Sequence, residues 1–309
     1  MRLREALVTL SAAIISSALH GAPLDKNKVA DDAKWVVHLD FDAFRVSKLG
    51  SYLTDNLLQP KLEAAESAKK LKLSVSFRNI SSITAYGVGY EKNGEGVMLI
   101  QTTANVKDDL DALAGLNALA ETDDREFKVV QQEPFLLYSM DDELFIAPRI
   151  EKTVVVANSK KQIANAREVL LGKAANLTAS KAFSEFPTGP DAFFFVGMAE
   201  GLTDNIPIPP QAKVLKETRG GRLVIGEKAE NLFVNVVFRG KSAEACTNVS
   251  QVLQGLVALA KIMPQQNEDV TALANTAQIG TKDQNVMLTL QLPISKAINK
   301  INEHHNIEP

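Results

Sequence analysis

The sequence predicts an α+β protein made of two similar halves, each a mainly antiparallel sheet with helices packed on one face. Three observations carry this prediction. Neighbouring runs of alternating apolar and polar residues, separated by short polar turns, are typical of antiparallel strands. Amphipathic helical stretches follow these pairs of runs. The same order of elements then occurs a second time in a chain of 309 residues, 45% of them hydrophobic, which is long enough for about two domains.

The first residues have the layout of a secretory signal peptide. Two arginines precede an apolar run over residues 6–19, and small residues follow it. A membrane-spanning helix needs about 20 apolar residues, so we expect this run to be removed and the mature chain to lack a membrane span. Cleavage after Ala18 or after Gly21 fits the small residues there, which gives a signal peptide over residues 1–21. A buried N-terminal helix is the alternative interpretation.

The first half covers residues 31–187. Asn93-Gly94 stands between two alternating runs, which is a strong signal for a hairpin. Ser159 and Gln162 have the spacing of a capping box, and Gly172 suits the position after a helix. The predicted elements are a strand at 35–40, helices at 41–58 and 61–71, a hairpin at 83–103, a helix at 106–116, strands at 126–132, 134–140, 143–150 and 152–158, and a helix at 159–172.

The second half, residues 188–309, repeats this order. Residue identity between the halves is low, so the repeat rests on the order of elements, and it is open whether the two sheets join or form separate lobes. The predicted elements are a strand and helix beginning within 191–202, a hairpin at 220–240, a helix at 242–263, a strand at 286–294 and a helix at 295–303.

Two stretches carry a resemblance to known proteins, "DAKWVVHLDFDAFRVSKLG" and "VVVANSKKQIANAREVLLGKAANLTASKAFSEF" followed by "DAFFFVGMAEGL". They resemble a loose group of exported bacterial proteins with a duplicated α+β domain of unknown function. The resemblance implies that fold and an exported location, either periplasmic or extracellular, and it brings no activity, cofactor or catalytic residue. The residues that carry it are Asn158, Gly172, Lys173, Leu177, Ser180, Ala182 and Phe183.

The charge of the chain bounds its partners. Removing the signal peptide, with Arg2, Arg4 and Glu5, changes the net charge from −3 to −4. A mildly acidic chain without a basic run is a poor candidate for binding nucleic acid or an anionic membrane surface.

Cys246 is the only cysteine, so an internal disulfide is excluded. It borders a helical apolar stripe, and we interpret it as a small buried apolar side chain.

One candidate site stands in the first strand. With period two, His38, Asp40 and Asp42 share one face, and imidazole with carboxylates suits zinc, manganese or iron. The alternative is structural, because Asp42 could cap a helix beginning at Ala43 and Asp40 stands at the strand end. The corresponding stretch of the second half carries none of the three, so the fold does not require them.

Other familiar chemistries have no signature in the sequence. There is no complete phosphate-binding loop, no G-x-S-x-G elbow and no calcium-loop spacing, and we expect no cofactor. We therefore expect a non-catalytic protein that binds an unknown protein or envelope component, or serves as a structural module. The first alternative is an exported metal-dependent enzyme centred on His38, Asp40 and Asp42. A second is a chaperone or inhibitor that uses an exposed sheet face, which predicts a contiguous apolar patch.

Overall fold

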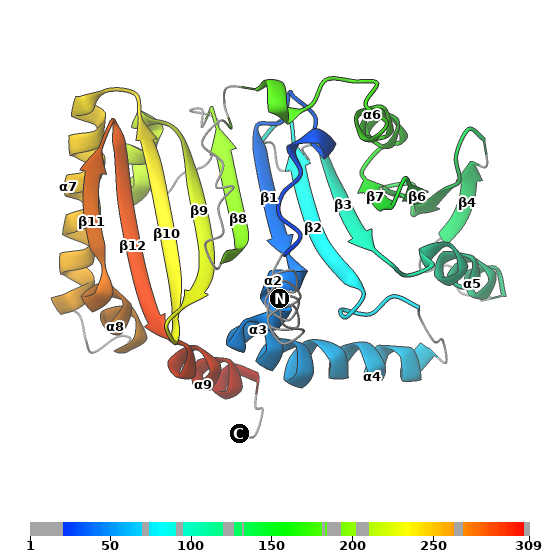
Figure 1. Ribbon diagram of the computed structural model, residues 1–309, viewed down its shortest axis with the longest axis horizontal. Helices are drawn as coiled ribbons and strands as arrows, with labels where there is room; N and C mark the ends of the chain where they lie inside the picture. Colours follow the sequence, from blue (N-terminus) through cyan, green and yellow to red (C-terminus); the bar gives the residue numbers. More distant parts are fainter. Residues whose placement is uncertain are drawn as a thin grey trace, which may run out of the picture.

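A computed structural model gives the structure of the chain (Figure 1). It describes residues 21–69, 74–90, 95–119, 127–131, 133–180, 183, 193–201, 210–262 and 268–305. The expected signal peptide before Gly21 and the Asn93-Gly94 turn lie outside these residues.

The strands form a single 12-stranded antiparallel sheet, in the order β11-β12-β10-β9-β8-β1-β2-β3-β7-β6-β5-β4. Strands β1 (Trp35–Asp40) and β8 (Phe193–Glu200) pair in its middle, with Val37 opposite Gly197. The predicted α+β class and antiparallel sheet are confirmed. The two halves do not form separate sheets, because this pair joins them into one.

In the first half the predicted hairpin and the strands after it are present. The expected helix over 41–58 is divided, since Ser47 has an extended backbone and its side chain accepts a hydrogen bond from the backbone of Gly50. The elements are η1 (Lys26–Lys28), β1, α2 (Phe41–Val46), α3 (Lys48–Leu53), η2 (Thr54–Leu58), α4 (Gln59–Lys69), β2 (Ile80–Gly87), β3 (Gly96–Thr102), α5 (Val106–Leu119), β4 (Phe127–Gln131), β5 (Leu137–Met140), β6 (Leu144–Ile150), β7 (Thr153–Ala157), α6 (Lys160–Leu170) and η3 (Leu177–Ala179).

The second half contains the predicted hairpin and the helices predicted at 242–263 and 295–303. The helix expected after the strand within 191–202 is not among the described residues, because β8 extends to Glu200 and residues 202–209 lie outside them. Two short helices, η4 and α8, and the edge strand β11 were not predicted, and β11 contains Gly280, which weakens its pattern. The elements are β8, η4 (Pro210–Glu217), β9 (Thr218–Lys228), β10 (Asn231–Gly240), α7 (Ala243–Ile262), α8 (Glu268–Thr276), β11 (Gln278–Lys282), β12 (Asn285–Pro293) and α9 (Ile294–His305).

Helix α6 has the capping predicted for it. The backbone N–H of Gln162 donates to the hydroxyl of Ser159, which satisfies one of the free donors at the helix start. Gly172 follows the helix with a φ of 68°, in the left-handed region that glycine enters at least cost.

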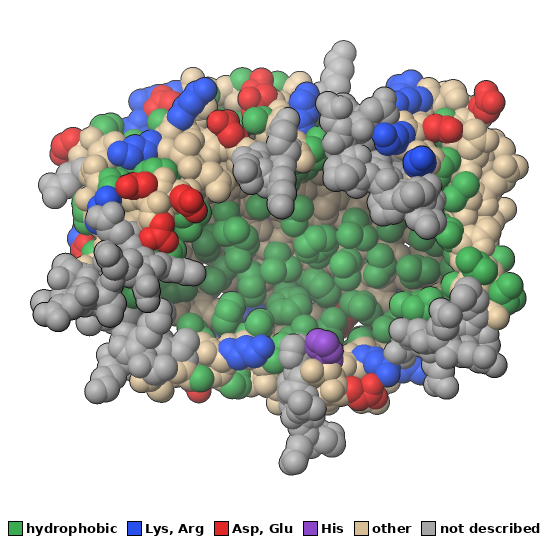
Figure 2. Space-filling model, turned by 180° about the vertical axis from the view of Figure 1, so that it is seen from behind, with side chains coloured by type: hydrophobic (Ala, Val, Ile, Leu, Met, Phe, Trp, Pro, Cys, Tyr) green, Lys and Arg blue, Asp and Glu red, His purple; other side chains and the backbone are tan. Residues whose placement is uncertain are grey.

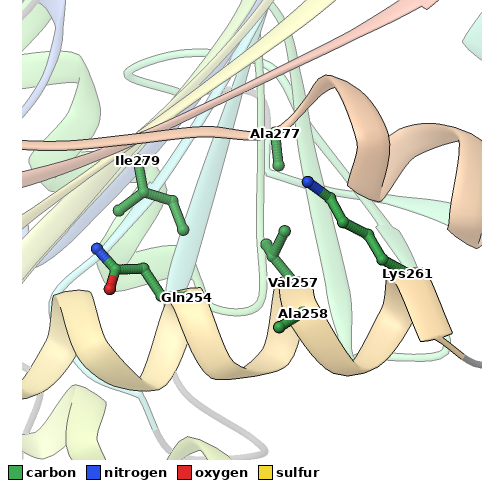
Figure 3. Close-up of a pocket in the computed structure, with 6 residues that line it drawn as sticks. All are labelled: Gln254, Val257, Ala258, Lys261, Ala277 and Ile279. Atoms are coloured by element: carbon green, nitrogen blue, oxygen red, sulfur yellow. The ribbon is translucent and has the colours of Figure 1, made fainter.

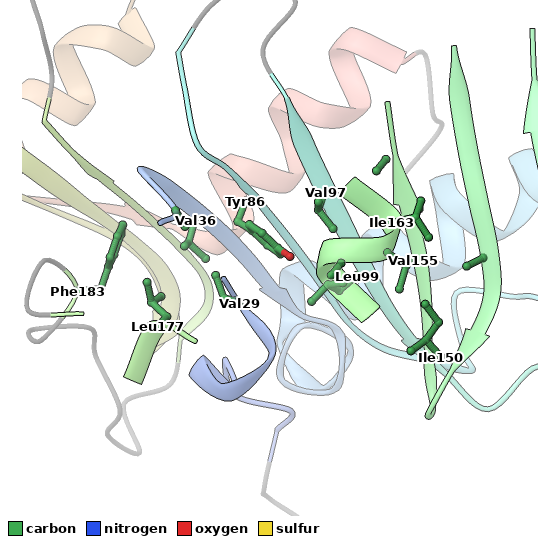
Figure 4. Packing of buried hydrophobic residues seen from close by; sticks show 14 of the residues in the cluster. Val29, Val36, Tyr86, Val97, Leu99, Ile150, Val155, Ile163, Leu177 and Phe183 are labelled. Atoms are coloured by element: carbon green, nitrogen blue, oxygen red, sulfur yellow. The ribbon is translucent and has the colours of Figure 1, made fainter. Parts of the chain in front are cut away.

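The largest core lies on one face of the sheet (Figure 4). Residues 21–34, which we call the strap, cross this face in front of β1 and bury Val29 and Ala33 (Figure 1). Helix α6 covers the same face through Ile163 and Ala166. We call this side of the sheet the strap face.

The other helices border the opposite face, which we call the open face. Helix α7 packs over its outer margin through Val249, which contacts Phe238 and Val286. At the other margin, α5 contacts β5 and β6, with the Tyr138 hydroxyl donating to Asp111. Helices therefore lie on both faces, but on the open face they stand at the margins. Within the described residues, no helix combines the length and hydropathy needed to cross a membrane.

Candidate functional site

The histidine proposed as a metal ligand is buried and both of its ring nitrogens have partners. His38 is 2% exposed, with Nδ1 2.9 Å from the Thr84 hydroxyl and Nε2 2.9 Å from the Ala22 carbonyl oxygen. Because a carbonyl oxygen only accepts, Nε2 carries the proton and Nδ1 accepts from Thr84. Burial lowers the pKa of His38, which outweighs the opposing effects of the Ala22 carbonyl and Asp40. The ring is therefore a neutral link between β2 and the strap.

The two aspartates have structural contacts at the start of α2. Asp40 caps the helix, because its carboxylate accepts from the backbone N–H of Ala43 at 2.8 Å. The sequence interpretation gave this role to Asp42, before a helix beginning at Ala43, whereas α2 begins at Phe41. Asp42 lies in the first turn and pairs with Arg45, while burial raises the pKa of its carboxyl. The described part of the chain contains no group of three His, Cys, Asp or Glu side chains placed to hold a metal ion.

Cys246 is buried near the start of α7, where its thiol lies 3.0 Å from the carbonyl oxygen of Gln284. Its place in the apolar cluster with Val249 and Val286 agrees with the interpretation as a small apolar side chain. The contact joins α7 to the turn between β11 and β12.

A different surface stands out once the two faces of the sheet are compared. In β1 the buried residues Val36, His38 and Asp40 alternate with the partly exposed Trp35, Val37 and Leu39. Side chains in a strand alternate between faces, so the second set lies on the open face. Neither set is polar throughout, which means that this strand presents apolar side chains to both sides.

The strand register extends the open face into two continuous rows of apolar residues. Each residue stands directly opposite the next one on the neighbouring strand. The upper row, from β6 to β11, is Ile146, Val156, Met98, Ala85, Val37, Gly197, Leu223, Val236, Leu288 and Ile279. The lower row, from β7 to β12, is Val154, Ile100, Ile83, Leu39, Phe195, Ile225, Val234 and Leu290.

The two rows differ in what covers them. Much of the lower row packs against Phe41 and Phe44 of α2. From Ile146 to Leu288, the upper row belongs to none of the buried clusters formed by the described residues, and Met98 remains 39% exposed. Figure 2 shows the result as a hollowed apolar surface with charged side chains at its border. An uncovered apolar patch of this kind is typical of an interaction site.

The opposite face of the second half of the sheet differs from the open face, because it carries polar side chains as well as apolar ones. On β9, β10 and β12, the residues facing away from the hollow include Arg222, Asn235 and Thr289. The amide of Asn235 donates to the hydroxyl of Thr289 at 3.1 Å. The same side also buries Val224 and Val237, so in the second half the face away from the hollow carries both polar and apolar side chains.

Two residues make the hollow accessible to experiment. At Gly197 a Cβ would meet only Phe195 at 3.7 Å and Val37 at 4.0 Å, so the middle of the upper row is open space. Trp35, the only tryptophan of the chain, lies at the end of the same face. Its Nε1 donates to the Gly89 carbonyl, and its ring lies over Gly87. Trp35 fluorescence should therefore respond to occupancy of the hollow.

A smaller pocket of about 270 Å³ lies at the edge of the sheet, between α7 and β11 (Figure 3). Val257 and Ile279 form apolar walls, and Lys261 extends its amine toward Ala277. Six residues line it, two of them alanines, so it offers fewer apolar side chains than the two rows of the open face.

Sequence reasoning missed the open face as a located site. The signal was present, because β3 and β8 contain consecutive apolar residues at 97–100 and 193–196, although antiparallel strands with one solvated face alternate. Such a pattern usually means that both faces are covered. Only the positions of the helices reveal that the described residues leave the upper row of one face uncovered.

The fold has a counterpart among solved structures. One described as crystal form IV of TP0453 has a TM-score of 0.50 at 8% sequence identity, covering 91% of this chain and 97% of that one. Crystal form I of TP0453 has a TM-score of 0.48 at 10% identity, covering 91% and 98%. At such identities the likeness concerns the fold alone. No protein-family model matches the sequence, and no curated protein matches it.

Proposed function

We propose that this chain is an exported, non-catalytic binding protein that holds a hydrophobic partner against the open face of its sheet. The observation that carries the proposal is the upper row from Ile146 to Leu288, a continuous series of apolar residues that no buried cluster of the described residues includes. Leaving such a surface in water costs about 25 cal/mol per Å², so a stable chain retains it only for a partner.

Several observations support the other parts of this proposal. The signal-peptide layout and the resemblance to exported bacterial proteins favour export. His38 and Asp40 are engaged with Ala22 and Ala43, so the candidate metal ligands hold the fold together. The proposal makes the periplasm or the outside of the cell the place where the partner is met.

Binding of an uncharged hydrophobic dye such as Nile red to the chain from Ala22 onward tests this function. Trp35 emission provides a second readout within the same face. The variant Gly197→Leu fills the centre of the hollow, and we expect it to weaken dye binding about tenfold or more, which corresponds to about 1.4 kcal/mol of lost contact.

Gly280→Leu is the matched control. Gly280 is also a strand glycine with ordinary space around it, since a Cβ there would lie 3.9 Å from Met287, but it stands on the opposite side of the sheet. This variant should bind the dye as the parent chain does. Equal affinity in all three chains, or no binding by the parent, would show that the open face is not a binding site.

A further inference from the structure

The chemistry of the hollow restricts what can lie in it. Among the described residues, the two rows carry no charged side chain and no amide or hydroxyl group. The backbone groups of strands such as β1 and β9 are engaged by neighbouring strands on both sides. A ligand segment on this floor therefore finds no hydrogen-bond partner, and burying its polar groups there would be costly. Hydrocarbon meets this requirement, whereas an extended peptide would lose its backbone hydrogen bonds.

The shape of the surface restricts the occupant further. The floor is recessed, with helices at its margins (Figures 1 and 2). A flat bilayer would contact the border and leave the floor empty. A second copy presenting the same concave face would leave a void between the two floors. A single flexible chain can enter and follow the rows.

Three exposed cations, Lys213, Arg219 and Lys241, belong to η4, the start of β9 and the residue after β10. Arg219 stands two residues before Gly221, at an irregularity where Gly220 faces Arg239 and Thr218 faces Gly240. Its guanidinium donates to the carbonyl oxygen of Lys241, whose own amine donates to the carbonyl oxygen of Lys216.

These bonds hold Arg219 and Lys241 close together. Each bond uses a backbone carbonyl oxygen as its acceptor, so no carboxylate takes part in either of them. Among the described acids nearby, Glu217 accepts from Asn248 and Glu200 pairs with Arg239, so both carboxylates already have partners. The end of the hollow is therefore complementary to an anionic group.

The distance between the cations and the floor fits such a ligand. Along β9, Leu223 of the upper row stands four residues after Arg219, which is about 14 Å at the rise of an antiparallel strand. An acyl chain that spans one leaflet of a bilayer covers about 15 Å, half of the hydrocarbon core. A chain with its head at Arg219 would reach the rows near the middle of the sheet.

We propose that the open face binds a single anionic amphiphile, with its hydrocarbon chain on the apolar rows and its carboxylate or phosphate head at Lys213, Arg219 and Lys241. This inference rests on the proposed function and names the class of partner. It makes the chain a carrier for individual lipid molecules.

The test compares two probes with the same tail, dodecanoate and uncharged 1-dodecanol, by titration of Trp35 emission at low ionic strength. We expect dodecanoate to bind about tenfold more tightly, the effect of two weak exposed charge contacts. The double variant Lys213→Glu/Lys241→Glu should remove this preference and leave dodecanol binding unchanged. Gly197→Leu should weaken both probes, because it blocks the chain.

A second double variant, Lys161→Glu/Lys173→Glu, introduces the same charge change at exposed lysines in and after α6, which covers the strap face. It should leave both probes unaffected. Equal affinity for the acid and the alcohol would overturn the anionic head group while leaving the proposed function intact. If neither probe binds and Nile red does not bind either, both the anionic head group and the proposed function are wrong.

Two further results would replace the amphiphile with another occupant. Cosedimentation with phosphatidylglycerol vesicles, without binding of dodecanoate, would identify a membrane surface. A dimer in analytical ultracentrifugation that Gly197→Leu dissociates would identify a second copy of the chain. Either outcome contradicts the proposal that the chain carries individual lipid molecules.

Discussion

Filling the hollow should stabilise the protein, and the substitution Gly197→Leu tests this directly. A glycine inside a strand costs about 0.5–1 kcal/mol, because the unfolded chain has more conformations to lose. At Gly197 no atom outside its own neighbourhood lies closer than 3.7 Å to the new Cβ, so the substitution relieves this cost without a clash. The leucine side chain would also cover part of Phe195 and Val37.

The size of the effect follows from these terms. Burying about half of a leucine contributes roughly 1 kcal/mol, and ordering its side chain costs about half of that. Together with the backbone contribution, we expect a gain of about 1 kcal/mol in the free energy of unfolding. For a chain of this length that raises the melting temperature by about 2 °C.

Scanning calorimetry, with urea unfolding as a second measure, provides the assay. Gly280→Leu serves as the comparison, because its side chain points to the opposite face at the sheet edge, where the new Cβ would meet only Met287, at 3.9 Å. Gly197→Leu should exceed it. A melting temperature below that of the parent chain would refute the reasoning, since it would mean that the space above Gly197 is already filled.

Further predictions concern the strap, the thiol and the leader. Since burial lowers the folded pKa of His38, the unfolded chain binds its proton more readily, and the free energy of unfolding should fall as the pH drops below about 6.5. His38→Gln should lose less stability over that range in pH-dependent urea titrations. Cys246 should resist a water-soluble thiol reagent until the protein unfolds, because it is buried against Gln284; rapid modification of the native protein would contradict this. Elemental analysis should find no stoichiometric metal, and metal lost on His38→Ala would restore the enzyme hypothesis. Mass spectrometry of the exported protein should place its first residue at Leu19 or Ala22.

Local patterns predicted many of the elements of this fold. The capping of α6 by Ser159 and the hairpins of both halves follow from interactions between residues close in sequence, such as the hydrogen bond to Gln162. Elements whose form depends on distant contacts were harder to predict from the sequence. The division of the helix after β1 at Ser47 and the short edge strand β11 could not be read from periodicity.

The candidate site also shows the difference between local patterns, which the sequence predicts, and distant contacts, which it does not. Sequence pattern placed His38, Asp40 and Asp42 on one face, but the structure gives them separate structural contacts. His38 binds the strap through the carbonyl oxygen of Ala22, which lies 16 residues before it in the chain, and no sequence pattern connected the two. Whether a titratable side chain is free to bind a ligand depends on such long-range partners.

The sequence by itself determined the class of this protein, its antiparallel strands, its core side chains and the absence of familiar catalytic signatures, because these depend on local periodicity and residue chemistry. Only the tertiary structure decided that the two halves share one sheet and that one of its apolar faces stays uncovered. The reason is physical: a run of apolar residues is the same whether a helix or a ligand covers it, and the packing of distant elements alone separates the two cases.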